Sequence, residues 1–195
     1  MAILSVNSER LLGHIRELGS IGRETDGRLS RLALSDADRL GRDCLVSWIR
    51  AAGLDVAIDQ IGNIFGIWAN DKNRDQTPIM LGSHIDTVIN AGIYDGCYGV
   101  IAGLEVIQTF KDADMRPDRP IVVASFTNEE GVRFSPDMMG SCVYAGGLDL
   151  QKALATRGID GAVLGSELSR IGYARSLSHI RRCRRSGLRY SPQPA

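Results

Sequence analysis

The chain has 195 residues, of which 44% are hydrophobic and 24% charged, and its 23 basic side chains balance 23 acidic ones. This composition is that of a globular protein and excludes disordered, collagen-like and disulfide-scaffold classes. Zero net charge gives the chain as a whole no electrostatic attraction for nucleic acid or an anionic membrane. No apolar run approaches the roughly 20 residues of a membrane-spanning helix, and the start lacks the basic and apolar regions of a secretory signal. We therefore expect a cytoplasmic protein with no nucleic-acid or membrane partner.

The cysteines are widely spaced and form no CxxC pair, which argues against a zinc ribbon and against a disulfide framework. Most of them are expected to be buried small hydrophobic residues, with the last, which stands among arginines, as the exception. They are Cys44, Cys97, Cys142 and Cys183.

The first part of the chain predicts two helices and a hairpin. Apolar residues at helical spacing from Leu11 to Leu18 indicate the first helix, and Gly19 stands where a C-terminal capping glycine would be. Ser35 is a predicted N-cap for a second helix that ends at Gly53. Residues 54–58 alternate in polarity and are separated from the apolar residues 64–68 by a Gly-Asn turn, which predicts a β-hairpin.

The middle of the chain predicts an α/β fold. Residues 78–82 and 120–126 are continuous apolar runs, a pattern typical of strands covered on both faces in a parallel sheet. A helical stretch over 100–110 is long enough to connect them as a crossover. Further helices are expected within 137–144, 149–156 and 160–170. The predicted fold class is α/β, with a mixed, largely parallel sheet flanked by helices.

Polar residues follow both apolar runs. His84 and Asp86 come after the first, and the adjacent acids Glu129 and Glu130 come after the second. The ends of parallel strands meet at one edge of a sheet, where functional groups of open α/β folds gather. Asp95 lies in a glycine-rich turn that opens the crossover helix and can return a carboxylate to this edge.

Each of these signals has a structural alternative when taken alone. His84 and Asp86 could be a hydrogen-bonded pair, Asp95 a helix cap, and the two glutamates a solvated turn. Together, an imidazole and several carboxylates are the ligand mix of a hydrolytic divalent-metal site, suited to zinc, manganese or cobalt.

The residue types also suggest a division of roles. Two ions need a bridging carboxylate, and Asp95 is the natural candidate. His84 would bind one ion and Glu130 the other. Glu129, beside a ligand, could transfer protons as the catalytic acid and base, and Asp86 could orient the His84 ring.

Four segments in order carry a resemblance to a known family: 81–88, 92–100, 126–134 and 136–141. Together they resemble the amidase, hydantoinase and carbamoylase branch of the M20 metallopeptidase superfamily, and the similarity runs from about residue 8 to residue 174. The resemblance implies binuclear metal-dependent hydrolysis of small ureido substrates such as N-carbamoyl-L-amino acids or allantoate. It also implies that His84, Asp95 and Glu130 bind the ions, that Asp95 bridges them, and that Glu129 is the general acid and base.

The resemblance further implies a longer protein that forms a homodimer through a lid domain, with two more metal-binding histidines. We therefore expect residues 1–174 to be the amino-terminal part of a zinc-peptidase-like catalytic domain, with the lid absent. The alternative interpretation is that the chain is a truncated, catalytically inactive remnant of such an enzyme.

The last segment, 175–195, is rich in arginine and departs from the family pattern. Its composition is typical of translation in a shifted frame or of a disrupted gene, and an arm that binds nucleic acid is a weaker interpretation. His179 is not assigned a ligand role.

Overall fold

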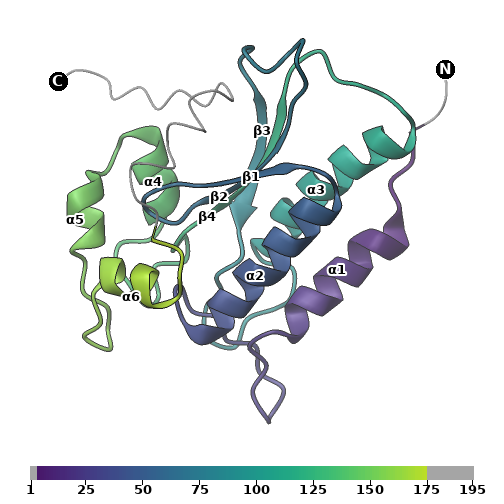
Figure 1. The fold of residues 1–195 in the computed structure, drawn as a ribbon. Coiled ribbons are helices and arrows are strands. Elements are labelled where there is room, and N and C mark those ends of the chain that lie inside the picture. Colours follow the sequence, from purple (N-terminus) through teal and green to yellow (C-terminus); the bar gives the residue numbers. More distant parts are fainter. Residues whose placement is uncertain (1–3, 175–195) are drawn as a thin grey trace.

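The apolar patterns of the sequence form six helices and one four-stranded sheet in the computed structural model, which describes residues 4–174 (Figure 1). The strands are β1 (Asp55–Ile58), β2 (Ile64–Trp68), β3 (Ile79–His84) and β4 (Ile121–Phe126). The helices are α1 (Ser8–Ser20), α2 (Asp36–Ala51), α3 (Cys97–Asp112), α4 (Met139–Ala145), α5 (Leu150–Leu154) and α6 (Leu164–Arg170). The arginine-rich segment and its His179 lie outside the described residues. Among the helices described, none is both long and apolar enough to cross a membrane.

The helix ends follow local capping chemistry. The Ser35 side chain accepts a hydrogen bond from the backbone N–H of Asp38, which confirms the predicted N-cap of α2. Gly53 follows α2 with a φ of +69°, a conformation that glycine adopts without steric cost. Gly19 differs from its prediction because it lies inside α1 and is buried. A Cβ there would come within 2.6 Å of Ile93, so this glycine permits close packing rather than ending the helix.

The strand order is β1-β2-β4-β3. The predicted hairpin is confirmed, since β1 pairs antiparallel with β2. Strand β2 also pairs antiparallel with β4, and β3 pairs parallel with β4. The expected mixed sheet is therefore confirmed, but among the described residues its one parallel pairing is β3 with β4. These strands are direct neighbours, so the residues that follow them leave the sheet side by side.

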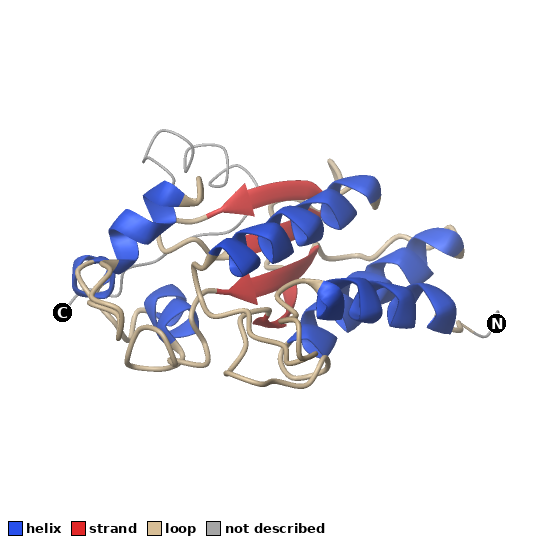
Figure 2. Ribbon diagram, turned by 90° about the horizontal axis from the view of Figure 1, so that it is seen from below, coloured by secondary structure: helices blue, strands red, loops and turns tan. Residues whose placement is uncertain are grey.

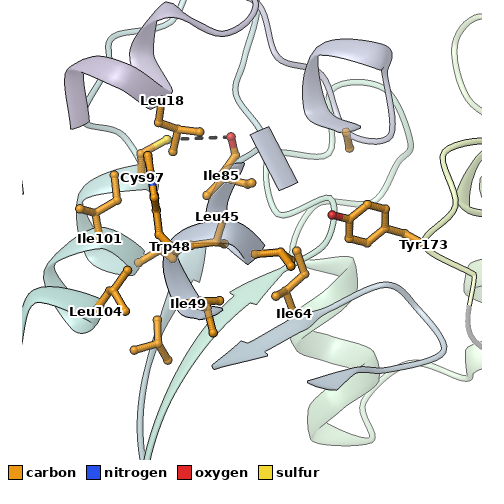
Figure 3. Packing of buried hydrophobic residues seen from close by; sticks show 14 of the residues in the cluster. Leu18, Leu45, Trp48, Ile49, Ile64, Ile85, Cys97, Ile101, Leu104 and Tyr173 are labelled. Atoms are coloured by element: carbon orange, nitrogen blue, oxygen red, sulfur yellow. Dashed lines mark hydrogen bonds between the residues drawn. The ribbon is translucent and has the colours of Figure 1, made fainter. Parts of the chain in front are cut away.

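The main core lies between one face of the sheet and the helices α2 and α3, with α1 packed against α3 (Figure 1). Figure 2 shows the strands from below, in the middle of the molecule with helices beside them. Leucine and isoleucine side chains from α2 and α3 fill this core, and burial of each contributes about 1.5–3 kcal/mol (Figure 3). Helices α4, α5 and α6 lie together at another side of the sheet (Figure 1).

The cysteines that the structure describes are free thiols. Cys97 is buried in the core, as expected, whereas Cys44 and Cys142 are only partly buried.

Candidate metal centre

The carboxyl-terminal ends of β3 and β4 bring the predicted site residues together. His84 is the last residue of β3 and pairs in register with Phe126, the last residue of β4. Glu129 and Glu130 follow β4 after two residues, and Asp95 lies just before α3. Three ligand atoms, one each from His84, Asp95 and Glu130, lie within 4.8 Å of one another.

The geometry and donor set of this group fit a divalent metal ion. The distance from His84 Nε2 to Glu130 Oε1 is 3.9 Å, which is too long for a hydrogen bond. Zinc–nitrogen and zinc–oxygen bonds of about 2.0–2.2 Å can span such a gap, with the ion between the two atoms. One imidazole nitrogen and carboxylate oxygens are donors that suit zinc, manganese or cobalt. His84, Asp95 and Glu130 could therefore hold a metal ion.

The orientation of the His84 ring supports this assignment. Its Nδ1 atom lies 2.9 Å from the backbone carbonyl oxygen of Asp86. A carbonyl can only accept, so Nδ1 carries a proton, and in the neutral ring this leaves the lone pair of Nε2 free on the side of Glu130. Metal-binding histidines are oriented by the same kind of hydrogen bond from the second ring nitrogen.

Asp86 acts differently from the sequence expectation. Its carboxylate oxygen lies 3.8 Å from His84 Nδ1, so the main-chain carbonyl and not the side chain accepts the ring proton. The carboxylate instead accepts the backbone N–H groups of Glu129, at 3.3 Å, and Glu130, at 3.2 Å. Asp86 thus ties the end of β3 to the residues that follow β4.

The Asp86 carboxylate is almost fully buried. Burial, together with the nearby charge of Asp38, raises its pKa to about 6, although His84 and the two backbone donors oppose this. Burial also raises the pKa of Glu130, and the charge of Asp95 adds to the effect. Burial is thus the main cause of both raised pKa values, and His84 opposes it in each case.

Glu129 does not belong to the ligand group. Its Oε1 atom accepts the backbone N–H of Ser141 at 2.9 Å, and its Oε2 atom accepts the Ser141 hydroxyl at 2.7 Å. Ser141 lies in the first turn of α4. Both oxygens of Glu129 are therefore fixed by the first turn of α4. Ser141 closes the 136–141 motif, but its residue type alone does not indicate a contact with Glu129.

A buried amide fixes the segment around Glu129. The Asn63 side chain accepts the backbone N–H of Thr127 at 2.8 Å and donates to the carbonyl of Gly140 at 3.0 Å. It also donates to Asp59 at 2.8 Å. The turn of the β1–β2 hairpin therefore joins the end of β4 to the start of α4.

The sheet with its flanking helices is an α/β fold, and the donor set at its edge is a candidate divalent-metal site. The model of Peptidase family M28 matches residues 63–173, and the chain belongs to this family.

Two curated relatives have names that agree with the hydrolysis of ureido substrates implied by the resemblance. The chain is 40% identical over 168 residues to an N-carbamoyl-L-amino-acid amidohydrolase of Rhizobium meliloti, covering 86% of this chain and 40% of that protein. It is 36% identical over 159 residues to a ureidoglycolate hydrolase of Arabidopsis thaliana, covering 81% of this chain and 33% of that protein.

Solved structures agree with these relatives. The crystal structure of a hydantoinase/carbamoylase family amidase from Burkholderia ambifaria superposes with a TM-score of 0.87 at 40% identity, covering 91% of this chain and 44% of that one. The resemblance to the amidase, hydantoinase and carbamoylase proteins is thus confirmed. The chain spans 40% of the length of the Rhizobium meliloti relative and 33% of the length of the Arabidopsis thaliana relative.

Proposed function

We propose that the protein is a binuclear metal-dependent amidohydrolase of the N-carbamoyl-L-amino acid hydrolase or allantoate amidohydrolase type. Its reaction would be hydrolysis of a linear C–N bond in a small ureido substrate. The observation that carries the proposal is the ligand group of His84, Asp95 and Glu130. Glu129 directly precedes Glu130 in the chain, and its carboxylate is bonded to Ser141. The names of the relatives support the substrate class.

Within this proposal, His84 would hold one ion and Glu130 the other, and Asp95 would be the ligand that the two ions share. Zinc, manganese and cobalt all suit these donors. When bound, the ions would polarise the carbonyl group of the substrate and the attacking water.

Glu129 would serve as general base and then general acid. Its carboxylate accepts a proton as water attacks the ureido carbonyl and delivers that proton to the leaving nitrogen. Ser141 supports this role because it fixes both carboxylate oxygens without itself being ionised. Asp86 contributes by holding the backbone N–H groups of Glu129 and Glu130 in place.

Residues 1–174 would then be one part of a catalytic domain, and the complete protein would be a cytoplasmic homodimer.

The test is ammonia release from a panel of N-carbamoyl-L-amino acids and allantoate, with zinc, manganese or cobalt added to the chelator-treated protein. Glu129→Gln should lower the rate by about 10²–10⁴-fold and leave the bound metal unchanged. Glu9→Gln, at an exposed position of α1, is the matched control and should keep the full rate. If metal binds but no substrate releases ammonia, the inactive-remnant alternative is favoured.

A further inference from the structure

Arg31 is a fully buried guanidinium, with 0% of the residue exposed. None of the ion pairs among residues 4–174 includes it. Burial of a cation without a carboxylate partner is costly unless its N–H groups are satisfied. The hydrogen bonds of the Arg31 guanidinium therefore show what stabilises its buried charge.

The guanidinium donates to three different segments. Nε donates to the carbonyl of Ile85 at 2.8 Å, and Nη2 donates to the Cys97 sulfur at 3.1 Å. Nη1 donates to the carbonyls of Leu18 and Ile21, each at 2.8 Å, at the end of α1. Figure 3 shows Leu18, Ile85 and Cys97 gathered in one place in the core.

Two of these segments carry proposed metal ligands. Ile85 directly follows His84, and Cys97 opens α3 two residues after Asp95. The backbone of Arg31 makes two further hydrogen bonds to the segment that follows β3. Its N–H donates to the Thr87 hydroxyl at 2.8 Å, and its carbonyl accepts the Thr87 N–H at 2.9 Å.

We infer that Arg31 is a positioning residue that sets the distance between His84 and Asp95 and thereby the affinity of the site for metal. This inference rests on the proposed metal site. The planar fork of the guanidinium can bond Ile85, Cys97 and the end of α1 at once, which the single ammonium of a lysine cannot do.

A purely structural role is the competing interpretation, because Arg31 also satisfies the last carbonyls of α1. The two roles differ in one measurable respect. A structural clamp alters stability alone, whereas a positioning residue alters metal affinity in the folded protein.

The experiment compares Mn²⁺ dissociation constants, from electron paramagnetic resonance of free Mn²⁺, with unfolding midpoints. Arg31→Lys should weaken Mn²⁺ binding about 10- to 100-fold, the range typical of residues that orient ligands. Cys97→Ala removes the Arg31 contact to the start of α3, together with the long contact of the Cys97 sulfur to the Ile85 carbonyl at 3.9 Å. It should weaken binding in the same direction by a smaller factor. Arg10→Lys is the control, since Arg10 joins α1 to Glu105 and Asp112 in the second half of α3 and bonds neither the end of β3 nor the start of α3. It should lower stability and leave Mn²⁺ affinity unchanged.

Wild-type Mn²⁺ affinity in folded Arg31→Lys would overturn the inference. If Arg31→Lys does not fold, Cys97→Ala decides by the same comparison, and an unchanged affinity overturns the inference. If the wild-type chain binds no Mn²⁺, the proposed function fails, and the crystal structure of Arg31→Lys, or of Cys97→Ala, decides the positioning role. Ligand atoms spread beyond the present 4.8 Å would support it, and an unchanged group would overturn it.

Discussion

Gly96 and His84 are in a contact that only glycine permits. A Cβ atom at position 96 would lie 2.2 Å from Cε1 of the His84 ring and 2.4 Å from Nδ1. Gly96 also has a φ of +65°, which L side chains rarely adopt. The turn that carries Asp95 thus approaches His84 closely because position 96 has no side chain.

Gly96→Ala should therefore displace the His84 ring and weaken metal binding by about tenfold or more. The measurement is a Mn²⁺ titration of the folded variant. Gly92→Ala is the control in the same turn, because a Cβ at Gly92 meets no atom within 4 Å. Equal affinities for the two variants would contradict this account of the turn.

Asn63→Ala should lower the free energy of unfolding by about 1–3 kcal/mol, because it leaves the buried N–H of Thr127 without its acceptor. The same change releases the carbonyl of Gly140 from its amide donor. Urea denaturation monitored by circular dichroism measures the loss. A change within about 0.5 kcal/mol would show that water replaces the amide, contrary to the burial of Asn63.

Glu105→Gln should lower stability at neutral pH and progressively less in acid. Burial alone would raise the pKa of Glu105, but hydrogen bonds from Arg10 and the backbone of Asn7 outweigh burial and hold this pKa below its usual 4.5. A lowered carboxyl pKa stabilises the fold above the unfolded pKa, and that contribution is lost as the pH falls through the folded pKa. We expect a loss of about 1.5–3 kcal/mol at pH 7.

Urea denaturation of both proteins between neutral pH and pH 3 tests this dependence. The difference between them should stay constant above the unfolded pKa of Glu105 and shrink below it. Asp112→Asn is the control, because Asp112 also bonds Arg10 but is 62% exposed, and exposed pairs contribute about 0–1 kcal/mol. A difference that grows in acid would contradict the predicted sign.

The convergence of His84, Asp95 and Glu130 could be predicted from the sequence because each follows from a local signal. Two apolar strands ending in polar residues place His84 and Glu130 at one edge, and a glycine-rich turn returns Asp95 to it. Strand pairing could not be predicted in the same way. Strands β2 and β4 are far apart in the chain but pair antiparallel. An apolar run in the sequence does not indicate which other strand it pairs with.

The hydrogen bonds that orient the site residues could not be predicted from the sequence. Asp86 is at the predicted edge, yet its carbonyl and its carboxylate have different partners, which depend on how β3 and β4 end. Ser141 reaches Glu129 only because α4 starts beside β4. Such contacts arise from tertiary packing, and residue type alone does not specify them.

We propose above all that Asp95 is shared by two ions that His84 and Glu130 hold. The most direct test is metal content per chain, by plasma mass spectrometry after equilibrium dialysis against Mn²⁺ or Zn²⁺. We predict two ions in the wild-type protein, two in Glu129→Gln, and loss of both in Asp95→Ala, because each ion would lose a shared ligand. Wild-type occupancy in folded Asp95→Ala would contradict the claim.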